Sequence, residues 1–365
     1  NKNPLPLKLK NDNKKDRLRI GYFSADFHEH PVMYMIGQTF ELHNRDKFDI
    51  YAYSYGPPKN DPIRQQIKNT FTVFRDVRMM SDIEITKLAR RDQIDVAIDL
   101  TGYTQGGRTN IFAYRAAPVQ INYLGFPGTM GANFFDYIVA DKNLIPENSQ
   151  RYYYEKPIYL PNHYAAQNNS LTISKETPSR KELGIPEKAF VFCAINNSYK
   201  INYHVFEIWM NLLKRIDNSV LWLLDNNNTA TSNLTKCANS LRINPNRLIF
   251  AKRNSHEKYL AQFRQADLYL DTFLCNAGST STNALWAGLP VLTKLGKGYA
   301  TRIAGSFLNS LKMNELITST EEEYEELAYY LATNPKKLSQ IKQKLYKNRI
   351  SKPLFNSKLF TQHLE

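Results

Sequence analysis

The sequence predicts an α/β protein made of two doubly wound domains in tandem. Short apolar strands alternate with helical segments in the first half of the chain, and the same alternation returns in the second half. This alternation is typical of a parallel sheet covered by helices on both faces. With 365 residues, 42% of them hydrophobic, the chain is long enough for two cores. Two such domains bind ligands in the cleft between them, at the carboxyl ends of their strands.

The first half contains four predicted strands, each an apolar run of seven or eight residues. They cover residues 18–25, 48–55, 71–77 and 94–100. A helix is expected after Pro31, and two more over residues 61–70 and 81–91. Residues 165–180 are polar and apolar-poor, as a connector between domains should be. We therefore expect an N-terminal domain of residues 1–170 and a C-terminal domain of residues 171–365.

The second half repeats this pattern, with helices between its strands. The predicted strands cover residues 190–195, 219–224, 247–250, 267–272 and 290–293. From Glu321 onward the sequence reads as consecutive helices that close the C-terminal domain. No internal repeat of 20 to 50 residues is visible, which argues against a solenoid in this part of the chain.

Composition favours a cytoplasmic protein without a membrane partner. No apolar run approaches the roughly 18 residues that a spanning helix needs. The three cysteines are widely spaced and odd in number, which fits reduced thiols, and we expect all three in the cores. The net charge of +14 would attract nucleic acid, but the basic residues are spread along the chain with local runs only near its ends. A solvated lysine-rich surface is the preferred interpretation, and no specific nucleic acid is expected.

One motif in the second half predicts an anion site. Residues 271–293 read DTFLCNAGSTSTNALWAGLPVLT, and within them six consecutive residues, 277–282, are no larger than threonine. Small residues between a strand and a helix let backbone amides approach an anion, and the helix adds its positive end. We therefore expect Gly278, Ser279, Thr280, Ser281 and Thr282 to form a diphosphate cradle. The alternative is that these hydroxyls only cap the helix.

The anion needs a further cation, and Lys200 is the candidate. It follows the predicted strand 190–195 in the segment AINNSYKIN, beside Asn196 and Asn197, so it reaches the carboxyl edge of the same sheet. The sequence has no GxxxxGK[ST] and no GxGxxG motif, which counts against an NTPase or a dehydrogenase. It also has no Asp-x-Asp pair for a metal-bound nucleotide sugar. A site without metal must neutralise a leaving diphosphate with basic side chains and amides.

Three turns in the first half carry the remaining chemistry. SADFHEHP places His28 and His30 after the first strand, where His30 is suited to take a proton from an acceptor hydroxyl. A metal site at this His-x-His pair is the weaker alternative, since no other ligands complete it. The segments DLTGYTQGG and YLGFPGTMG follow further strands and suit close approach of a sugar or peptide. Their candidate residues are Thr101, Tyr103, Gly125, Pro127, Gly128 and Thr129.

These motifs, in order, resemble the catalytic region of the O-GlcNAc transferase and SPINDLY family. They are SADFHEHP, DLTGYTQGGRTNIFAYRAAPVQINYLGFPGTMG, NNSYKI, NSVLWLL, ADLYLDTFLCNAG and NALWAGLPVLT. The resemblance runs from Arg17 to the C-terminus. It implies a GT-B fold and an inverting, metal-independent transfer from a nucleotide sugar to Ser or Thr hydroxyls of proteins. It also implies tetratricopeptide repeats N-terminal to this chain.

The resemblance assigns roles to individual residues. Lys200 matches a diphosphate-binding lysine, His30 an acceptor-side histidine, and Ser279 and Thr280 a phosphate-binding pair. Three positions depart from animal members, because Tyr259 replaces a base-stacking histidine, Gly278 another histidine, and Asn283 a ribose-binding Asp. The predicted nucleotide-sugar set also includes Asn196, Asn197, Arg253, His256 and Asn276.

From these observations we expect a protein O-glycosyltransferase that uses UDP-GlcNAc and no metal or other cofactor. Lys200 and the 278–282 amides would stabilise the leaving diphosphate, and His30 would orient or deprotonate the acceptor. Asp92 or Asp95 is a less favoured proton acceptor. The alternatives are a GDP-fucose or other hexose transferase, a glycan acceptor, an inactive nucleotide-sugar-binding adaptor, and a nucleic-acid binder.

Overall fold

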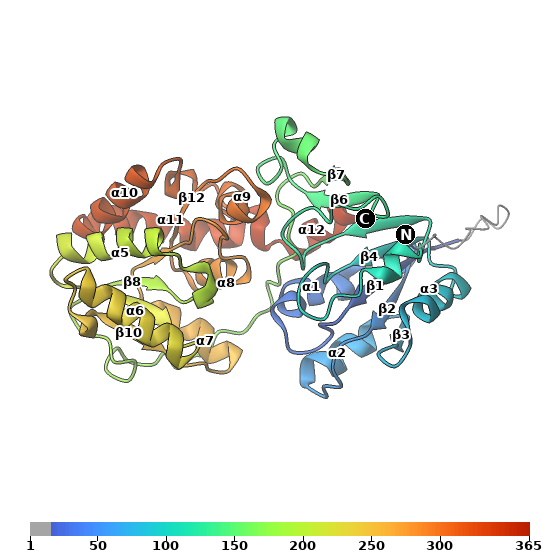
Figure 1. Cartoon of the computed structure of the whole chain (residues 1–365), viewed down its shortest axis with the longest axis horizontal. Coiled ribbons are helices and arrows are strands. Elements are labelled where there is room, and N and C mark those ends of the chain that lie inside the picture. Colours follow the sequence, from blue (N-terminus) through green and yellow to red (C-terminus); the bar gives the residue numbers. More distant parts are fainter. Residues whose placement is uncertain (1–15) are drawn as a thin grey trace. The chain divides into compact units, whose positions relative to one another are not determined.

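The chain folds into two compact units, which the computed structural model describes for residues 16–365 (Figure 1). One unit contains residues 16–170 together with Asn356–Glu365, and the other is Leu171–Phe355. Each unit is built on one parallel sheet, as the alternation of strands and helices predicted.

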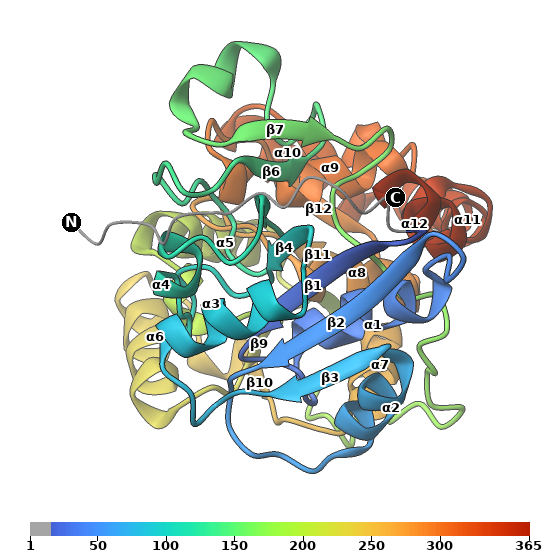
Figure 2. The same ribbon diagram turned by 90° about the vertical axis from the view of Figure 1, so that its right-hand side faces the viewer.

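The sheet of the first unit has seven strands among the described residues, in the order β3-β2-β1-β4-β5-β6-β7, and every neighbouring pair is parallel (Figure 2). The strands are β1 Leu18–Ser24, β2 Phe48–Ser54, β3 Val73–Asp76, β4 Val96–Asp99, β5 Val119–Asn122, β6 Tyr137–Ala140 and β7 Lys156–Tyr159. The first four match predicted strands. The last three were not predicted, since they are four-residue segments within a turn-rich region.

Helices cover this sheet on two sides, and each side has its own core. The helices are α1 Pro31–Leu42, α2 Pro62–Thr70, α3 Asp82–Arg91, α4 Asn110–Ala113 and α12 Ser357–Leu364. Side chains alternate along a strand, so adjacent residues of β1 enter opposite cores. Tyr22 packs in one cluster with Phe40 of α1 and Phe360 of α12. Phe23 packs in the other with Ile85 of α3 and Phe112 of α4.

The last helix differs from the expectation that residues 171–365 form one domain. Phe360 of α12 lies in the core of the first unit and stacks on His163 with ring centroids 5.3 Å apart. The Glu365 carboxylate accepts a hydrogen bond from the Asn44 amide at 2.7 Å and contacts the His43 ring at 3.1 Å. An apolar face of α1 would otherwise be uncovered, which explains why residues 356–365 join the first unit.

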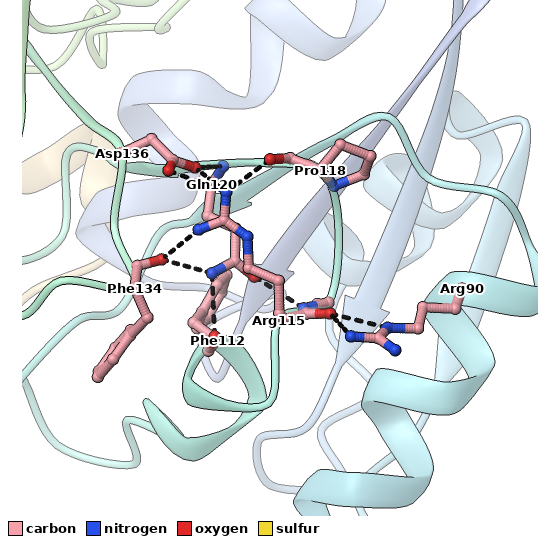
Figure 3. Close-up of polar contacts among 8 residues, drawn as sticks. Arg90, Phe112, Arg115, Pro118, Gln120, Phe134 and Asp136 are labelled. Atoms are coloured by element: carbon pink, nitrogen blue, oxygen red, sulfur yellow. Dashed lines mark hydrogen bonds and ion pairs between the residues drawn. The ribbon is translucent and has the colours of Figure 1, made fainter. Parts of the chain in front are cut away.

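A polar network fixes the chain between α4 and β6 (Figure 3). Arg115 adopts a left-handed backbone with a φ of 65°, and its guanidinium pairs with Asp136 at 2.7 Å. Its carbonyl accepts a hydrogen bond from Arg90 of α3 at 2.7 Å. The buried Gln120 amide of β5 donates to the carbonyls of Phe112 and Phe134. These bonds anchor both ends of the segment that carries the glycine-rich turn after β5.

The second unit has a six-stranded parallel sheet among the described residues, in the order β10-β9-β8-β11-β12-β13. The strands are β8 Phe190–Ala194, β9 Ser219–Leu224, β10 Leu248–Ala251, β11 Leu268–Leu270, β12 Val291–Lys294 and β13 Ile317–Thr318. The helices are α5 Tyr203–Arg215, α6 Asn228–Ser240, α7 His256–Gln262, α8 Ser279–Ala287, α9 Ile303–Ser310, α10 Glu321–Thr333 and α11 Pro335–Ser351. All five predicted strands are present, and only β13 was not predicted.

Short 3-10 helices complete the two units. They are η1 Glu147–Tyr152, η2 Ser198–Lys200, η3 Pro245–Arg247, η4 Phe263–Gln265, η5 Tyr299–Thr301, η6 Asn314–Leu316 and η7 Pro353–Phe355. The expectation that all three cysteines are core residues was wrong, because Cys193 is buried whereas Cys237 and Cys275 are partly exposed. No helix within residues 16–365 is long and apolar enough to span a bilayer.

Candidate active site

The turn after β1 holds His30 at the start of α1. Pro31 occupies the first helical position, and His30 is the N-cap residue, whose Nδ1 accepts the Val32 amide at 3.3 Å. In the neutral ring an accepting Nδ1 leaves the proton on Nε2, which then acts as a donor. Burial, with His28 and Lys59 nearby, lowers the pKa of His30 to about 4. His30 is therefore suited to orient an oxygen atom rather than to take a proton at neutral pH.

Asp26 lies in the same turn and was not among the predicted residues. Its Oδ2 is 3.7 Å from Nδ1 of His30, and only 13% of its side chain is exposed. Burial raises the pKa of Asp26 to about 6, although the charge of His28 acts in the opposite direction. A carboxyl group with this pKa is ionised at neutral pH and close to the value that suits a general base.

The turn after β4 packs against this first turn. The Oγ1 atom of Thr101 is buried and accepts the Ala25 amide at 3.1 Å, so Thr101 joins the two turns. The carboxylate of Asp99 accepts the amides of Thr101 and Gly102, and burial raises its pKa to about 6. Tyr103 is 55% exposed, and its hydroxyl donates to the Met130 carbonyl at 2.9 Å. Thr101 is thus buried between the two turns, whereas Tyr103 lies at the surface.

The glycine-rich turn after β5 lies on the same edge. A Cβ atom on Gly125 would be 1.9 Å from the Leu100 carbonyl oxygen, so no larger residue fits there. Thr129 donates to the buried carboxylate of Glu155, which also accepts the Met130 amide at 2.5 Å. The Gly128 carbonyl accepts Nδ2 of Asn122 at 2.8 Å. Pro127 and Gly128 are partly exposed. The structure therefore places the predicted acceptor-side residues on one edge of the first sheet.

The structure separates Asp92 and Asp95 from that edge. Asp92 ends α3 and Asp95 directly precedes β4, so both lie at the amino end of a parallel sheet whose carboxyl end carries His30. Asp92 pairs with Arg75 at 2.7 Å and accepts a hydrogen bond from Tyr53 at 2.8 Å. Asp95 accepts the Arg19 amide at 2.9 Å. These contacts are structural, so the structure contradicts a role for Asp92 or Asp95 as proton acceptor beside His30.

In the second unit, Lys200 follows β8 at the carboxyl edge of the sheet. It ends the 3-10 helix η2, and its Nζ donates to the Asn276 carbonyl at 2.9 Å. Asn276 is buried, and its side-chain Nδ2 donates to the Thr272 carbonyl at 2.7 Å. Lys200 and the segment before α8 are therefore in direct contact, as their positions after neighbouring strands β8 and β11 predicted.

The small residues divide into a helix start and a buried helix face. Gly278 is the N-cap of α8, which begins at Ser279. Ser279 and Thr280 are partly exposed in the first turn, where the first amides of a helix have no partner within it. Ser281 and Thr282 are buried, and their hydroxyls donate to backbone carbonyls of the same turn. Part of the predicted cradle is therefore helix packing, and the accessible part consists of residues 278–280.

A pocket of about 220 Å³ lies beside the start of α8. Its lining combines the ends of β8, β9 and β10 with one residue each of α7 and α8, namely Ile195, Asn196, Asn197, Leu224, Lys252, Arg253, Asn254, Tyr259 and Thr280. Nδ2 of Asn196 is buried without a hydrogen-bond partner among residues 16–365. Since buried polar atoms are usually paired, this atom is suited to meet a ligand. Ile195, Leu224, Lys252 and Asn254 were not among the predicted site residues, whereas Arg253 was.

Tyr259 connects α7 to α8. Its side chain hydrogen-bonds to Thr280 and Asn283, and burial raises its pKa. The ring lies 6.2 Å from the ring of His256, the first residue of α7. Tyr259, Gly278 and Asn283, the three positions expected to depart from animal sequences, are therefore close to one another around the start of α8.

Asp271 is buried beneath the loop that leads to α8 and was not among the predicted residues, although it begins the quoted motif. It is fully buried, and its Oδ1 accepts the amides of Thr272 at 2.9 Å and Ala277 at 2.7 Å. Its Oδ2 accepts the Thr293 hydroxyl at 2.7 Å. Burial raises the pKa of Asp271 to about 7, although these hydrogen bonds and the charge of Lys200 act in the opposite direction. Asp271 closes the loop 272–277 that leads to α8.

Comparison with known proteins agrees with this arrangement. The model of glycosyl transferase family 41 matches residues 1–173 and 165–364. The probable UDP-N-acetylglucosamine–peptide N-acetylglucosaminyltransferase SEC of Arabidopsis thaliana is 36% identical over 99% of this chain and 38% of its own length. The UDP-N-acetylglucosamine–peptide N-acetylglucosaminyltransferase of Caenorhabditis elegans is 24% identical over 96% of this chain and 40% of its own. The chain thus spans about two fifths of these relatives.

Solved structures support the fold class. A variant of the Thermobaculum terrenum O-GlcNAc transferase superimposes with a TM-score of 0.89 and 30% identity, covering 95% of this chain and 66% of that one. Anabaena HepE in complex with UDP and glucose superimposes with a TM-score of 0.60 at 11% identity, covering 95% and 99% of the two chains. The predicted GT-B class, with two parallel α/β units, is confirmed.

Proposed function

The chain belongs to glycosyl transferase family 41, and from this premise we propose that it transfers N-acetylglucosamine from UDP-GlcNAc to Ser or Thr hydroxyls of proteins. The observation that carries this proposal is the contact of Lys200 with the segment that opens α8. The relatives named as peptide N-acetylglucosaminyltransferases support the choice of donor and acceptor.

The second unit would bind the donor. A departing UDP places negative charge on its diphosphate, and Lys200 with the first amides of α8 supplies positive charge for it. Because Lys200 and these amides can neutralise the departing diphosphate, no metal ion is needed for that role, and we propose a metal-independent reaction. The 220 Å³ pocket with Asn196, Arg253 and Tyr259 is the proposed place of the nucleoside.

The first unit would bind the acceptor. We propose that the acceptor hydroxyl attacks the anomeric carbon from the side opposite the diphosphate, so that the configuration inverts. His30 donates through Nε2 and orients an oxygen of the substrates, because its Nδ1 is engaged by the Val32 amide. Asp26, in the same turn, is better suited to receive the hydroxyl proton, since its pKa of about 6 leaves it ionised at neutral pH.

The donor assignment is tested by calorimetric titration of UDP and GDP, without metal, into the wild-type chain and Lys200→Ala. We expect tight binding of UDP that the substitution weakens strongly. Preference for GDP would change the donor to a GDP-sugar such as GDP-fucose. Binding of neither nucleotide would overturn the assignment of the second unit as donor site. Transfer from UDP-GlcNAc to a panel of Ser- and Thr-containing peptides then separates a transferase from a protein that only binds the nucleotide sugar.

A further inference from the structure

A second pocket lies in the first unit, between α2 and the end of β3. It has a volume of about 320 Å³ and is lined by Pro58, Lys59, Asn60, Arg64, Gln65, Lys68, Phe74, Asp76 and Arg78. Four cations and one carboxylate give this lining a net charge of +3. We propose that this α2–β3 pocket binds an anionic side chain, a carboxylate or a phosphate, of the protein acceptor. The inference rests on the proposed function, because it names the acceptor class of that activity.

Internal contacts leave two of the four cations unpaired. Arg64 pairs with Asp76 at 3.3 Å and donates to the Phe27 carbonyl at 2.9 Å and to the Ser54 hydroxyl at 3.0 Å. Arg78 lies 3.5 Å from the other oxygen of Asp76. The single carboxylate is therefore shared by two arginines. Within residues 16–365, neither Lys59 nor Lys68 has an ion-pair partner, so both are available to an external anion.

The carboxylate of Asp61, which precedes α2, is already engaged by backbone amides. Its two oxygens accept the amides of Arg64 at 2.8 Å and Glu29 at 3.0 Å. It therefore serves as the N-cap of α2 and ties that helix to the histidine turn. Lys59 and Lys68, on the lining, remain without a carboxylate of their own.

The pocket adjoins the proposed acceptor side. Strands β3, β2 and β1 are neighbours in one parallel sheet, so their carboxyl ends share an edge. Asp76 and Arg78 lie at the end of β3 and just beyond it, and His30 follows β1. The bond from Arg64 to the Phe27 carbonyl joins the pocket wall to the turn that carries His30. A peptide that presents its hydroxyl at His30 and extends toward β3 therefore crosses the pocket.

The lining favours an anionic side chain over a nucleotide. Its one aromatic residue is Phe74, and the guanidinium of Arg64 already covers that ring at 5.2 Å from the centroid. A nucleotide base therefore has no uncovered aromatic ring in this lining on which to stack. A carboxylate or phosphate needs only charge and hydrogen-bond donors, which two lysines and the edge of Arg78 supply. The pocket thereby gives the enzyme a preference for acceptors with acidic or phosphorylated residues near the modified hydroxyl.

The test is fluorescence anisotropy of the full chain with three labelled peptides that share one serine-containing sequence. One carries glutamates beside the serine, one carries phosphoserine at the same positions, and one carries glutamines. We expect both anionic peptides to bind about tenfold more tightly than the glutamine peptide, with a preference that falls as salt rises. Lys59→Glu/Lys68→Glu should abolish the preference. The tighter of the two anionic peptides identifies which anion the pocket favours.

A matched control reverses two lysines elsewhere, Lys336→Glu/Lys337→Glu, which are exposed on α11 of the second unit. It should keep the preference although its net charge changes by the same amount. Equal binding of the three peptides, or a preference that survives Lys59→Glu/Lys68→Glu, overturns the inference. GlcNAc transfer is measured on the same preparations. Charge-dependent binding without transfer would refute the proposed function alone, and transfer without charge preference would refute the pocket alone.

Discussion

Replacing Asp271 by asparagine should change how the stability of the second unit depends on pH. Burial raises the pKa of Asp271 from 3.8 to about 7, so the folded protein prefers its protonated form. A raised pKa gives stability that is fully present below pH 3.8 and is lost as the pH rises through 7. At about 1.4 kcal/mol per pKa unit, ionisation costs the wild type about 4 kcal/mol by pH 8. The asparagine side chain of the Asp271→Asn variant does not ionise and escapes this cost.

The substitution preserves the hydrogen bonds that hold the loop. The remaining oxygen accepts the amides of Thr272 and Ala277, and the new amide can donate to Thr293 after its hydroxyl rotates. At pH 4 the variant should therefore be within about 1 kcal/mol of the wild type. By pH 8 its free energy of unfolding should exceed that of the wild type by a few kcal/mol.

Urea unfolding followed by tryptophan fluorescence measures this difference, because all three tryptophans, Trp209, Trp222 and Trp286, lie in the second unit. The first unit, with Asp26 and Asp99, does not contribute to that signal. Glu322→Gln, at an exposed carboxylate of α10, is the control and should leave the pH profile unchanged. A wild-type minus variant difference that stays constant from pH 4 to pH 8 would refute the argument, because Asp271 would then be ionised at no cost.

Further predictions concern the donor site, the proton acceptor and the discontinuous first unit. Lys200→Ala should weaken UDP binding by about 10- to 100-fold in calorimetry, because a charge-assisted bond is lost; an unchanged Kd would contradict its role. The wild-type transfer rate should rise with pH through about 6, since Asp26 must be ionised to accept a proton. Asp26→Asn should lower kcat by about 10²- to 10⁴-fold and should abolish the rise of the rate with pH. Asp92→Asn should retain the wild-type kcat, per folded molecule, and the wild-type pH dependence. Phe360→Ala should destabilise the first unit by about 3 to 5 kcal/mol, seen as faster hydrogen exchange in α1.

The strands that the sequence predicted are those with clear apolar runs. FDIYAYS and SVLWLL are buried almost throughout and were identified with their correct ends to within one residue. KPIY of β7 contains a proline and three partly exposed residues, so neither alternation nor continuous burial marks it. Helix α12 packs on the first unit because Phe360 contacts residues more than 300 positions earlier in the chain. No local sequence pattern indicates such a contact.

The candidate site was predictable where a motif directly follows a strand. Lys200 and Ser279 follow β8 and β11, so their shared edge could be derived from topology alone. Asp92 and Asp95, the less favoured proton acceptors, precede β4 and so lie at the opposite edge of the sheet from His30. Asp26 lies within a quoted motif, but its suitability as a base depends on burial, which raises its pKa. The adjacent residues in the sequence do not indicate this burial.

Because α12 belongs to the first unit, the two units are completed in a fixed order during synthesis. Domains generally form as the chain emerges, with N-terminal parts first. Here the first unit cannot bury Phe360 or engage Glu365 until the whole of Leu171–Phe355 has been translated. The second unit is therefore complete in sequence before the first, and it folds as an insertion within its neighbour. A recombinant fragment that stops at residue 170 should expose the apolar side of α1 and aggregate, whereas residues 171–355 form a continuous segment that can be expressed alone.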